Sequence, residues 1–154
     1  MKKHKKTPNA ERRTSNAEPG CNGARVAELP SHPYAGRRYD LEERLLKFAA
    51  DIIELVESLP NTKAGNHIAG QLLRCGTSPL SNHGEVEAAE SRRDFLHKLR
   101  ICLKELRETK RWLRLVGCLK LTDVSALGSC ITEADELIRI FVASIRTAEK
   151  NEHK

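Results

Sequence analysis

One segment of the sequence carries basic side chains at a spacing that suits phosphate binding. Six arginines or lysines and one histidine recur at intervals of three or four positions, with no acid among them. They are Arg93, His97, Arg100, Lys104, Arg107, Arg111 and Arg114. Intervals of three and four place side chains on one face of an α-helix. We call this set the basic stripe, and its chemistry is the attraction of anions.

A negatively charged partner would relieve the repulsion between like charges three or four positions apart on a helix. The planar guanidinium of arginine also suits two phosphate oxygens at once. The basic stripe therefore indicates RNA or DNA binding through phosphates, with strong salt dependence, weak sequence preference and His97 joining when protonated. One alternative is a solvated face whose repulsion is relieved by acids on flanking helices. If subunits instead pack through this helix, the stripe would meet acids of a neighbour, such as Glu133, Asp135 or Glu136.

Four segments with apolar residues at helical spacing must position this stripe. They run over Leu41 to Ser58, Lys63 to Ala89, Arg92 to Val116 and Asp123 to Glu149. The connections between them are short, and no strand pattern interrupts them. We therefore predict an all-α protein, an antiparallel four-helix bundle over residues 39–150.

Residues at the segment ends predict where each helix begins or stops. Asp40, Thr62, Ser91 and Thr122 are expected N-caps, and Gly117 is expected to end the third helix. The sequence from Gly76 to Pro79 predicts a kink or a short break in the second helix, because an internal proline removes one backbone hydrogen bond.

The apolar face of the fourth segment is wider than one partner helix would cover. Leu137, Ile140 and Val142 lie outside its regular seam. This width favours a subunit interface, and the alternative is a broad intramolecular core.

Residues 1–38 differ in composition from the rest of the chain. Residues 1–40 hold nine Lys or Arg and four Asp or Glu, a balance of +5 out of the total net charge of +6. Prolines punctuate a segment with few apolar residues, and this composition predicts a disordered basic tail. The tail would add attraction to phosphates or would only be solvated. We find no secretory signal and no apolar run long enough to cross a bilayer.

The sequence contains no recognisable catalytic, cofactor or metal motif, so we predict a non-enzymatic protein without a cofactor or metal. Its five cysteines lack the Cys-x-x-Cys spacing and suggest reduced thiols in a cytoplasmic protein. Asp94-x-x-His97 is the nearest match to a di-iron motif, and Asp94 is better explained as a helix cap. The alternative is a small hydrolase or metal enzyme that uses His83, Glu85 and Glu87.

Trp112 lies at the flank of the apolar face of the third helix. It could stack on a base, or it could pack at the edge of the core or of an interface.

Several short motifs in the sequence resemble those of the 23S rRNA intervening-sequence proteins, also called the bacterial four-helix bundle family. They are Tyr39-Asp40-Leu41-Glu42-Glu43-Arg44 with Phe48-Ala49, Leu59-Pro60, Gln71-Leu72-x-Arg74, Asn82-x-x-Glu85, Asp94-Phe95-Leu96-His97-Lys98-Leu99, Ile101, Lys104-Glu105, Glu108 and Trp112-Leu113. The resemblance covers roughly residues 39–148 and departs from the family pattern at residues 75–81.

The resemblance implies a ring-shaped homopentamer of four-helix bundles for which RNA binding is the usual suggestion. A similar bundle is the accessory protein of diversity-generating retroelements, which works with a reverse transcriptase. It raises a second hypothesis for this chain, a protein–protein adaptor whose basic face docks a nucleic-acid-processing partner such as a reverse transcriptase.

Overall fold

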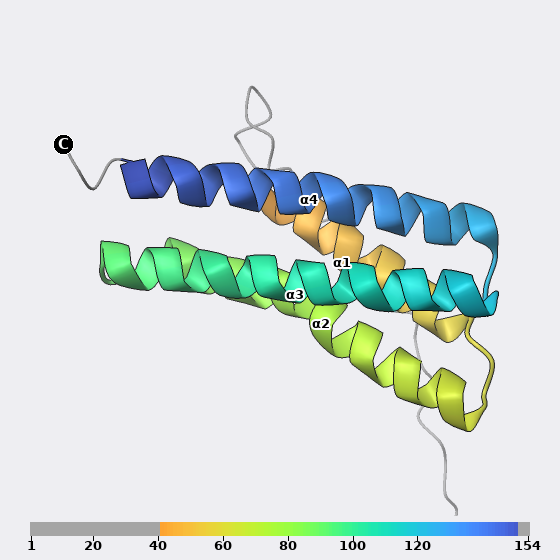
Figure 1. The fold of residues 1–154 in the computed structure, drawn as a ribbon. Coiled ribbons are helices and arrows are strands. Elements are labelled where there is room, and N and C mark those ends of the chain that lie inside the picture. The colour runs from red at the N-terminus through yellow and green to blue at the C-terminus, as the bar shows by residue number, and fades with distance from the viewer. Residues whose placement is uncertain (1–40, 151–154) are drawn as a thin grey trace, which may run out of the picture. The chain divides into compact units, whose positions relative to one another are not determined.

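The computed structural model describes residues 41–150, which form four α-helices packed as an antiparallel bundle (Figure 1). The helices are α1 (Leu41–Glu57), α2 (Lys63–Glu87), α3 (Arg92–Leu119) and α4 (Val124–Lys150). Each packs on its neighbours in sequence, and α1 also packs on α4. The all-α prediction is confirmed for these residues. The predicted disordered tail, residues 1–38, and the expected Asp40 cap lie outside the described residues.

The core is built from the apolar faces that the sequence predicts. Phe48 of α1, Leu72 of α2, Leu106 of α3 and Phe141 of α4 have exposed fractions of 1% or less. Within residues 41–150, Thr109 is the one buried polar residue, and its hydroxyl donates to the carbonyl of Glu105 at 2.9 Å. Burial of these faces turns the opposite face of each helix toward solvent.

The caps at the starts of α2 and α3 are confirmed. The side-chain oxygen of Thr62 accepts from the N–H of Gly65 at 3.0 Å, and that of Ser91 accepts from Asp94 at 3.1 Å. The carboxylate of Asp94 pairs with Lys98, one turn further along α3, at 3.2 Å.

The predicted end of α3 at Gly117 is wrong, because the helix continues to Leu119. Lys120 then adopts a left-handed backbone with φ of 52°. Its N–H donates to the carbonyl of Gly117, and the N–H of Leu121 donates to that of Val116. This pair of bonds is the Schellman motif. Leu121 packs against the core, and the motif holds it there.

The predicted cap of α4 is also wrong, because Asp123 takes the place expected for Thr122. Oδ2 of Asp123 accepts from the N–H groups of Ser125 at 3.0 Å and Ala126 at 3.4 Å. The hydroxyl of Thr122 lies instead 2.7 Å from that of Ser58, at the end of α1.

A kink or a short break was expected in α2, and the break does not occur, because the helix is continuous through Pro79. Close packing holds this region: Pro79, Cys75 and Gly76 are all buried. A Cβ added at Gly76 would lie 2.7 Å from Cγ2 of Ile52, so glycine lets α2 approach α1 closely. Figure 1 shows α2 changing direction along its length, with its first half diverging from α3.

The wide apolar face of α4 is covered mainly by its own chain. Leu137 has an exposed fraction of 0%, and Ile140 and Val142 are half-buried. The broad intramolecular core is therefore the better interpretation of this face. The exposed large apolar residues of the described chain are elsewhere: Leu46 and Ile53 on α1, Leu115 and Leu119 on α3, and Val124 at the start of α4.

Candidate nucleic-acid interface

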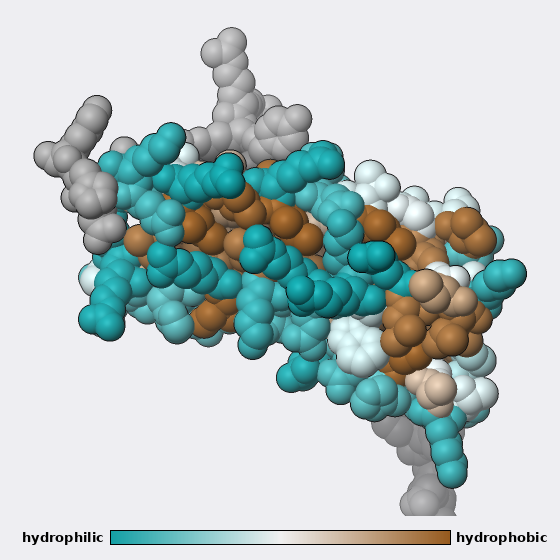
Figure 2. All heavy atoms as spheres, viewed as in Figure 1, coloured by the Kyte–Doolittle hydropathy of each residue, from teal (hydrophilic) through white to brown (hydrophobic). Residues whose placement is uncertain are grey.

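All seven residues of the basic stripe are exposed on the outer face of α3. The opposite face of this helix buries Leu99, Leu106 and Leu113 in the core, which fixes the rotation of α3 about its axis. Figure 2 shows hydrophilic side chains extending over the long face of the bundle that carries α3, with apolar surface visible between them. Apolar side chains gather at the end of the molecule where α3 passes into α4 (Figure 2).

Other basic residues of α3 tether the helix to its neighbours. On the α4 side, Arg92 donates to the carbonyl of Ala148, and the ammonium of Lys110 pairs with Asp135. On the α2 side, Lys98 pairs with Glu85 at 3.8 Å. Sequence analysis did not assign Arg92, Lys98 and Lys110 a role. The basic side chains of α3 thus form two groups. Arg92, Lys98 and Lys110 lie at the edges of the helix and contact α2 or α4, and the basic stripe lies between these edges.

Within the stripe, two of the seven residues have an acidic partner. Nη2 of Arg100 lies 2.8 Å from Oε1 of Glu149, and Nζ of Lys104 lies 3.8 Å from Oε1 of Glu105. No ion pair or hydrogen bond involves the other five side chains within residues 41–150: Arg93, His97, Arg107, Arg111 and Arg114. Acids of flanking helices therefore relieve the charge repulsion at only one stripe residue, Arg100.

The three acids considered as partners in a neighbouring subunit are occupied within their own chain. Glu133 pairs with Arg44 at 2.8 Å, Asp135 with Lys110, and Glu136 with Arg139 at 2.6 Å. A cation of a second copy would have to share each carboxylate with the cation of its own chain.

Charge is separated across the bundle. Helix α3 carries nine lysines and arginines against three acids, whereas α1 carries two against five. The two helices lie at opposite corners, and their backbones do not approach within 8 Å. The bundle therefore has one positive and one negative long side, although residues 41–154 together carry a net charge of only +1. A polyanion would be attracted to the α3 side.

The start of the stripe is hollowed. An open depression of about 510 Å³ is lined by Ser91 and Asp94 together with three members of the stripe, Arg93, His97 and Arg100. This concave shape allows several of the cations to approach one phosphate group.

The sequence alone did not predict which residue contacts the ring of Trp112. The structure places its ring against that of His67 on α2, with centroids 5.8 Å apart and ring planes at 72°. One pattern in the sequence could have placed His67 on the outside of α2. Intervals of three and four put it on one outer edge of that helix with Lys63, Gly70 and Arg74, and all four residues are exposed.

The alternative catalytic group is not assembled within the described residues. Nδ1 of His83 is buried without a hydrogen-bond partner, and its ring lies edge to face with Phe141. Glu85 instead pairs with Lys98, and Asn82 donates to the hydroxyl of Ser78 at 2.8 Å. In the part of the chain that the structure describes, no carboxylate hydrogen-bonds His83, as orienting a general base would require.

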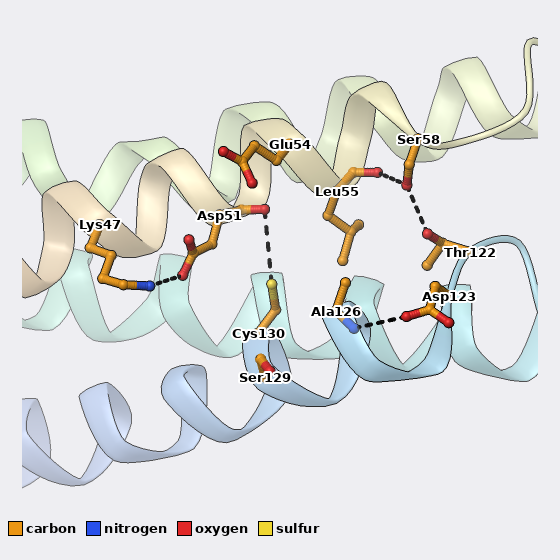
Figure 3. A pocket seen from close by; sticks show the side chains of 10 residues that line it. All are labelled: Lys47, Asp51, Glu54, Leu55, Ser58, Thr122, Asp123, Ala126, Ser129 and Cys130. Atoms are coloured by element: carbon orange, nitrogen blue, oxygen red, sulfur yellow. Dashed lines mark hydrogen bonds and ion pairs between the residues drawn. The ribbon is translucent and has the colours of Figure 1, made fainter.

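A second cleft, of about 460 Å³, lies between α1 and α4 (Figure 3). Asp51 pairs there with Lys47 at 2.8 Å and raises the pKa of that ammonium. Asp123 is occupied as the cap of α4. Across residues 41–150, no three His, Cys, Asp or Glu side chains are grouped to hold a metal ion.

The cysteines in the described part of the chain are unpaired thiols. Cys75, Cys102 and Cys130 are buried, and Cys118 is exposed. Burial raises the pKa of Cys102 to about 12. Among these same residues, no helix combines the length and hydrophobicity that crossing a membrane requires.

Comparison with known proteins identifies the family. A family described as "23S rRNA-intervening sequence protein" matches residues 38–143. A crystal structure of a protein of unknown function from the S23 ribosomal protein family of Bacteroides thetaiotaomicron is 33% identical, with a TM-score of 0.64. The match covers 68% of this chain and 97% of that one. The comparison with curated proteins gives no match. The sequence match and the shared bundle show that this chain belongs to the 23S rRNA-intervening sequence protein family.

Proposed function

We propose that this protein is a non-enzymatic, oligomeric bundle of the cytoplasm that binds RNA phosphates through the basic stripe of α3. The observation that carries the proposal is the exposure of all seven stripe residues, five of them without a partner in the described chain. The family description names 23S rRNA, which makes RNA the first nucleic acid to test.

The dimensions of the stripe suit a nucleic-acid backbone. From Arg93 to Arg114 it extends about 32 Å at 1.5 Å per helical residue. B-DNA places one phosphate per strand about every 3.4 Å along its axis, so the stripe spans roughly nine phosphates. Several weak contacts of this kind add together, and an oligomer multiplies them further.

Self-association is proposed through the outer face of α1. Leu46 and Ile53 are 49% and 44% exposed, and the exposed Ala50 lies between them on the same face. Because α1 and α3 lie at opposite corners, a contact through α1 leaves the basic stripe open to solvent. A homopentamer, as the family resemblance implies, is the assembly to look for.

The decisive test is charge reversal on the stripe in the full chain. Arg100→Glu, Arg107→Glu and Arg114→Glu together should abolish binding to labelled ribosomal RNA fragments in fluorescence anisotropy, with unchanged circular dichroism. The matched control is Arg139→Glu, Arg146→Glu and Lys150→Glu, which changes the net charge equally on exposed positions of α4. The proposal fails if the folded stripe variant keeps its affinity or if both variants lose it equally.

A chain that begins at Tyr39 separates the stripe from the N-terminal segment. Binding that survives this truncation and weakens steeply with salt supports the stripe. Loss of binding on truncation would instead direct attention to the adaptor hypothesis, in which the basic face docks an acidic protein.

A further inference from the structure

Two aromatic rings bridge α2 and α3 beside the basic stripe. His67 and Trp112 meet edge to face at 5.8 Å. His67 is exposed, and Trp112 is half-buried. Figure 1 shows the first half of α2 diverging from α3, so the two rings connect the helices where their backbones separate. Arg111, a member of the stripe, precedes Trp112 in the chain.

The polar atoms of both rings are available to a ligand. No hydrogen bond joins the indole N–H of Trp112 or the imidazole of His67 to any residue between 41 and 150. Neither ring is among the side chains with a buried, unpartnered nitrogen or oxygen. A tryptophan that serves only the core usually finds a partner for its N–H, whereas this one presents it to solvent.

Cations and open backbone lie on the same edge of α2. Lys63, Gly70 and Arg74 share the outer face with His67, and all are exposed. A Cβ added at Gly70 would meet nothing within 4 Å, so a ligand can approach the backbone there. Arg74 pairs with Glu108 of α3 at 3.1 Å and remains 68% exposed.

We propose that His67 and Trp112 form a base-stacking subsite that makes the protein prefer single-stranded RNA to duplex RNA. This inference rests on the proposed function, since the stripe supplies the phosphate contacts. A strand that follows the stripe past Arg111 brings an unpaired base against the two rings. Bases inside a duplex already stack on each other and cannot offer a face. Stacking tolerates any base, so the preference concerns strandedness rather than sequence.

The single tryptophan of the chain provides a direct readout. The full-length protein is titrated with oligouridine, with an abasic oligonucleotide of equal length, and with a duplex of the same length. The anisotropy of labelled strands gives the affinity, and intrinsic fluorescence with unlabelled strands reports stacking on Trp112. Oligouridine should bind and quench the emission of Trp112. The abasic strand should bind about tenfold more weakly without quenching, since one stacked base contributes roughly a factor of ten or more. The duplex should also leave the emission unchanged.

Two variants check the assignment. His67→Ala removes an exposed ring without touching the core, and Trp112→Leu keeps an apolar side chain at the core edge. In the anisotropy titration, which does not depend on Trp112, both variants should lose about tenfold in affinity for oligouridine and nothing for the abasic strand.

Equal affinity for the two strands, together with no quenching by oligouridine, overturns the stacking subsite while the proposed function stands. If neither strand binds, the proposed function fails, and the subsite fails with it. The wild-type titration decides the question even if Trp112→Leu does not fold.

Discussion

Arg100 and Glu149 join the basic stripe to the last turns of α4, with 2.8 Å between Nη2 and Oε1. Among residues 41–150, Glu149 is the one acid of another helix that reaches the stripe. The two side chains are 57% and 43% exposed, so their pair contributes little to stability. Under the proposed function, the pair neutralises one of the cations that would contact RNA.

Glu149→Gln should therefore strengthen RNA binding. The released Arg100 gains phosphate contacts, and affinity at low salt should rise a few-fold, while the free energy of unfolding changes by less than about 1 kcal/mol. Fluorescence anisotropy and urea denaturation measure the two quantities. Glu136→Gln, which frees Arg139 outside the stripe, is the control and should leave affinity unchanged. An unaltered affinity in Glu149→Gln would contradict this role of the pair.

The salt dependence of RNA binding should report how many phosphates the basic stripe contacts. Six cationic contacts to a single strand predict a slope of about −4 for log K against log salt concentration, at about −0.7 per phosphate. Arg107→Ala should reduce the magnitude of that slope by about 0.7 and weaken binding to all sequences alike. A variant that loses affinity at an unchanged slope would show that Arg107 does not contact phosphate.

Polar substitutions on the outer face of α1 should dissociate the proposed oligomer. Leu46→Gln with Ile53→Gln removes the exposed apolar surface on that face, and multi-angle light scattering should show a folded monomer. Leu119→Gln is the control, since Leu119 is 50% exposed but lies on a different helix, at the C-terminal end of α3. The α1 interface is excluded if the double variant keeps its mass or if the control dissociates.

Gly76→Ala should destabilise the bundle. Its Cβ would lie 2.7 Å from Cγ2 and 3.3 Å from Cβ of the fully buried Ile52, so the Ile52 side chain or helix α1 must shift. Overpacking of this kind costs about 1–3 kcal/mol. Gly84→Ala in the same helix meets nothing within 4 Å and should stabilise by up to about 1 kcal/mol. Thermal denaturation of the pair tests the close approach, and equal melting temperatures would argue against it.

The buried thiols predict a loss of stability in alkali. Burial raises the pKa of Cys102 from 9.0 to about 12, so the unfolded chain releases this proton at lower pH than the folded one. The contribution is fully present below pH 9.0 and is lost as the pH rises toward 12. Urea denaturation should show a falling free energy of unfolding over that range. In Cys102→Ser the free energy of unfolding should fall less steeply with pH than in the wild type. An identical pH dependence would show that Cys102 is not the titrating group.

Thiol labelling tests the same burial at neutral pH. In a Cys21→Ser background, a thiol reagent should modify Cys118 at once, because it is exposed. Cys75, Cys102 and Cys130 should react only as fast as the bundle opens. Rapid labelling of all four in the folded protein would contradict the packing.

Local chemistry in the sequence determined the helices, the caps at Thr62 and Ser91, and the face of α3 that meets water. Helical periodicity depends on intervals of three and four along the chain, so burying Leu106 and Leu113 leaves Arg107 and Arg114 outside. The exposure of the basic stripe follows from those intervals alone.

Tertiary packing decided the pairings between helices. Lys110 and Arg111 are adjacent cations, yet only Lys110 meets an acid, because the position of Asp135 depends on how α4 packs on α3. The meeting of His67 with Trp112 and the continuity of α2 through Pro79 depend in the same way on neighbouring helices. These contacts join residues distant in the chain, and their geometry is set by the burial of all four apolar faces together, which no local pattern records.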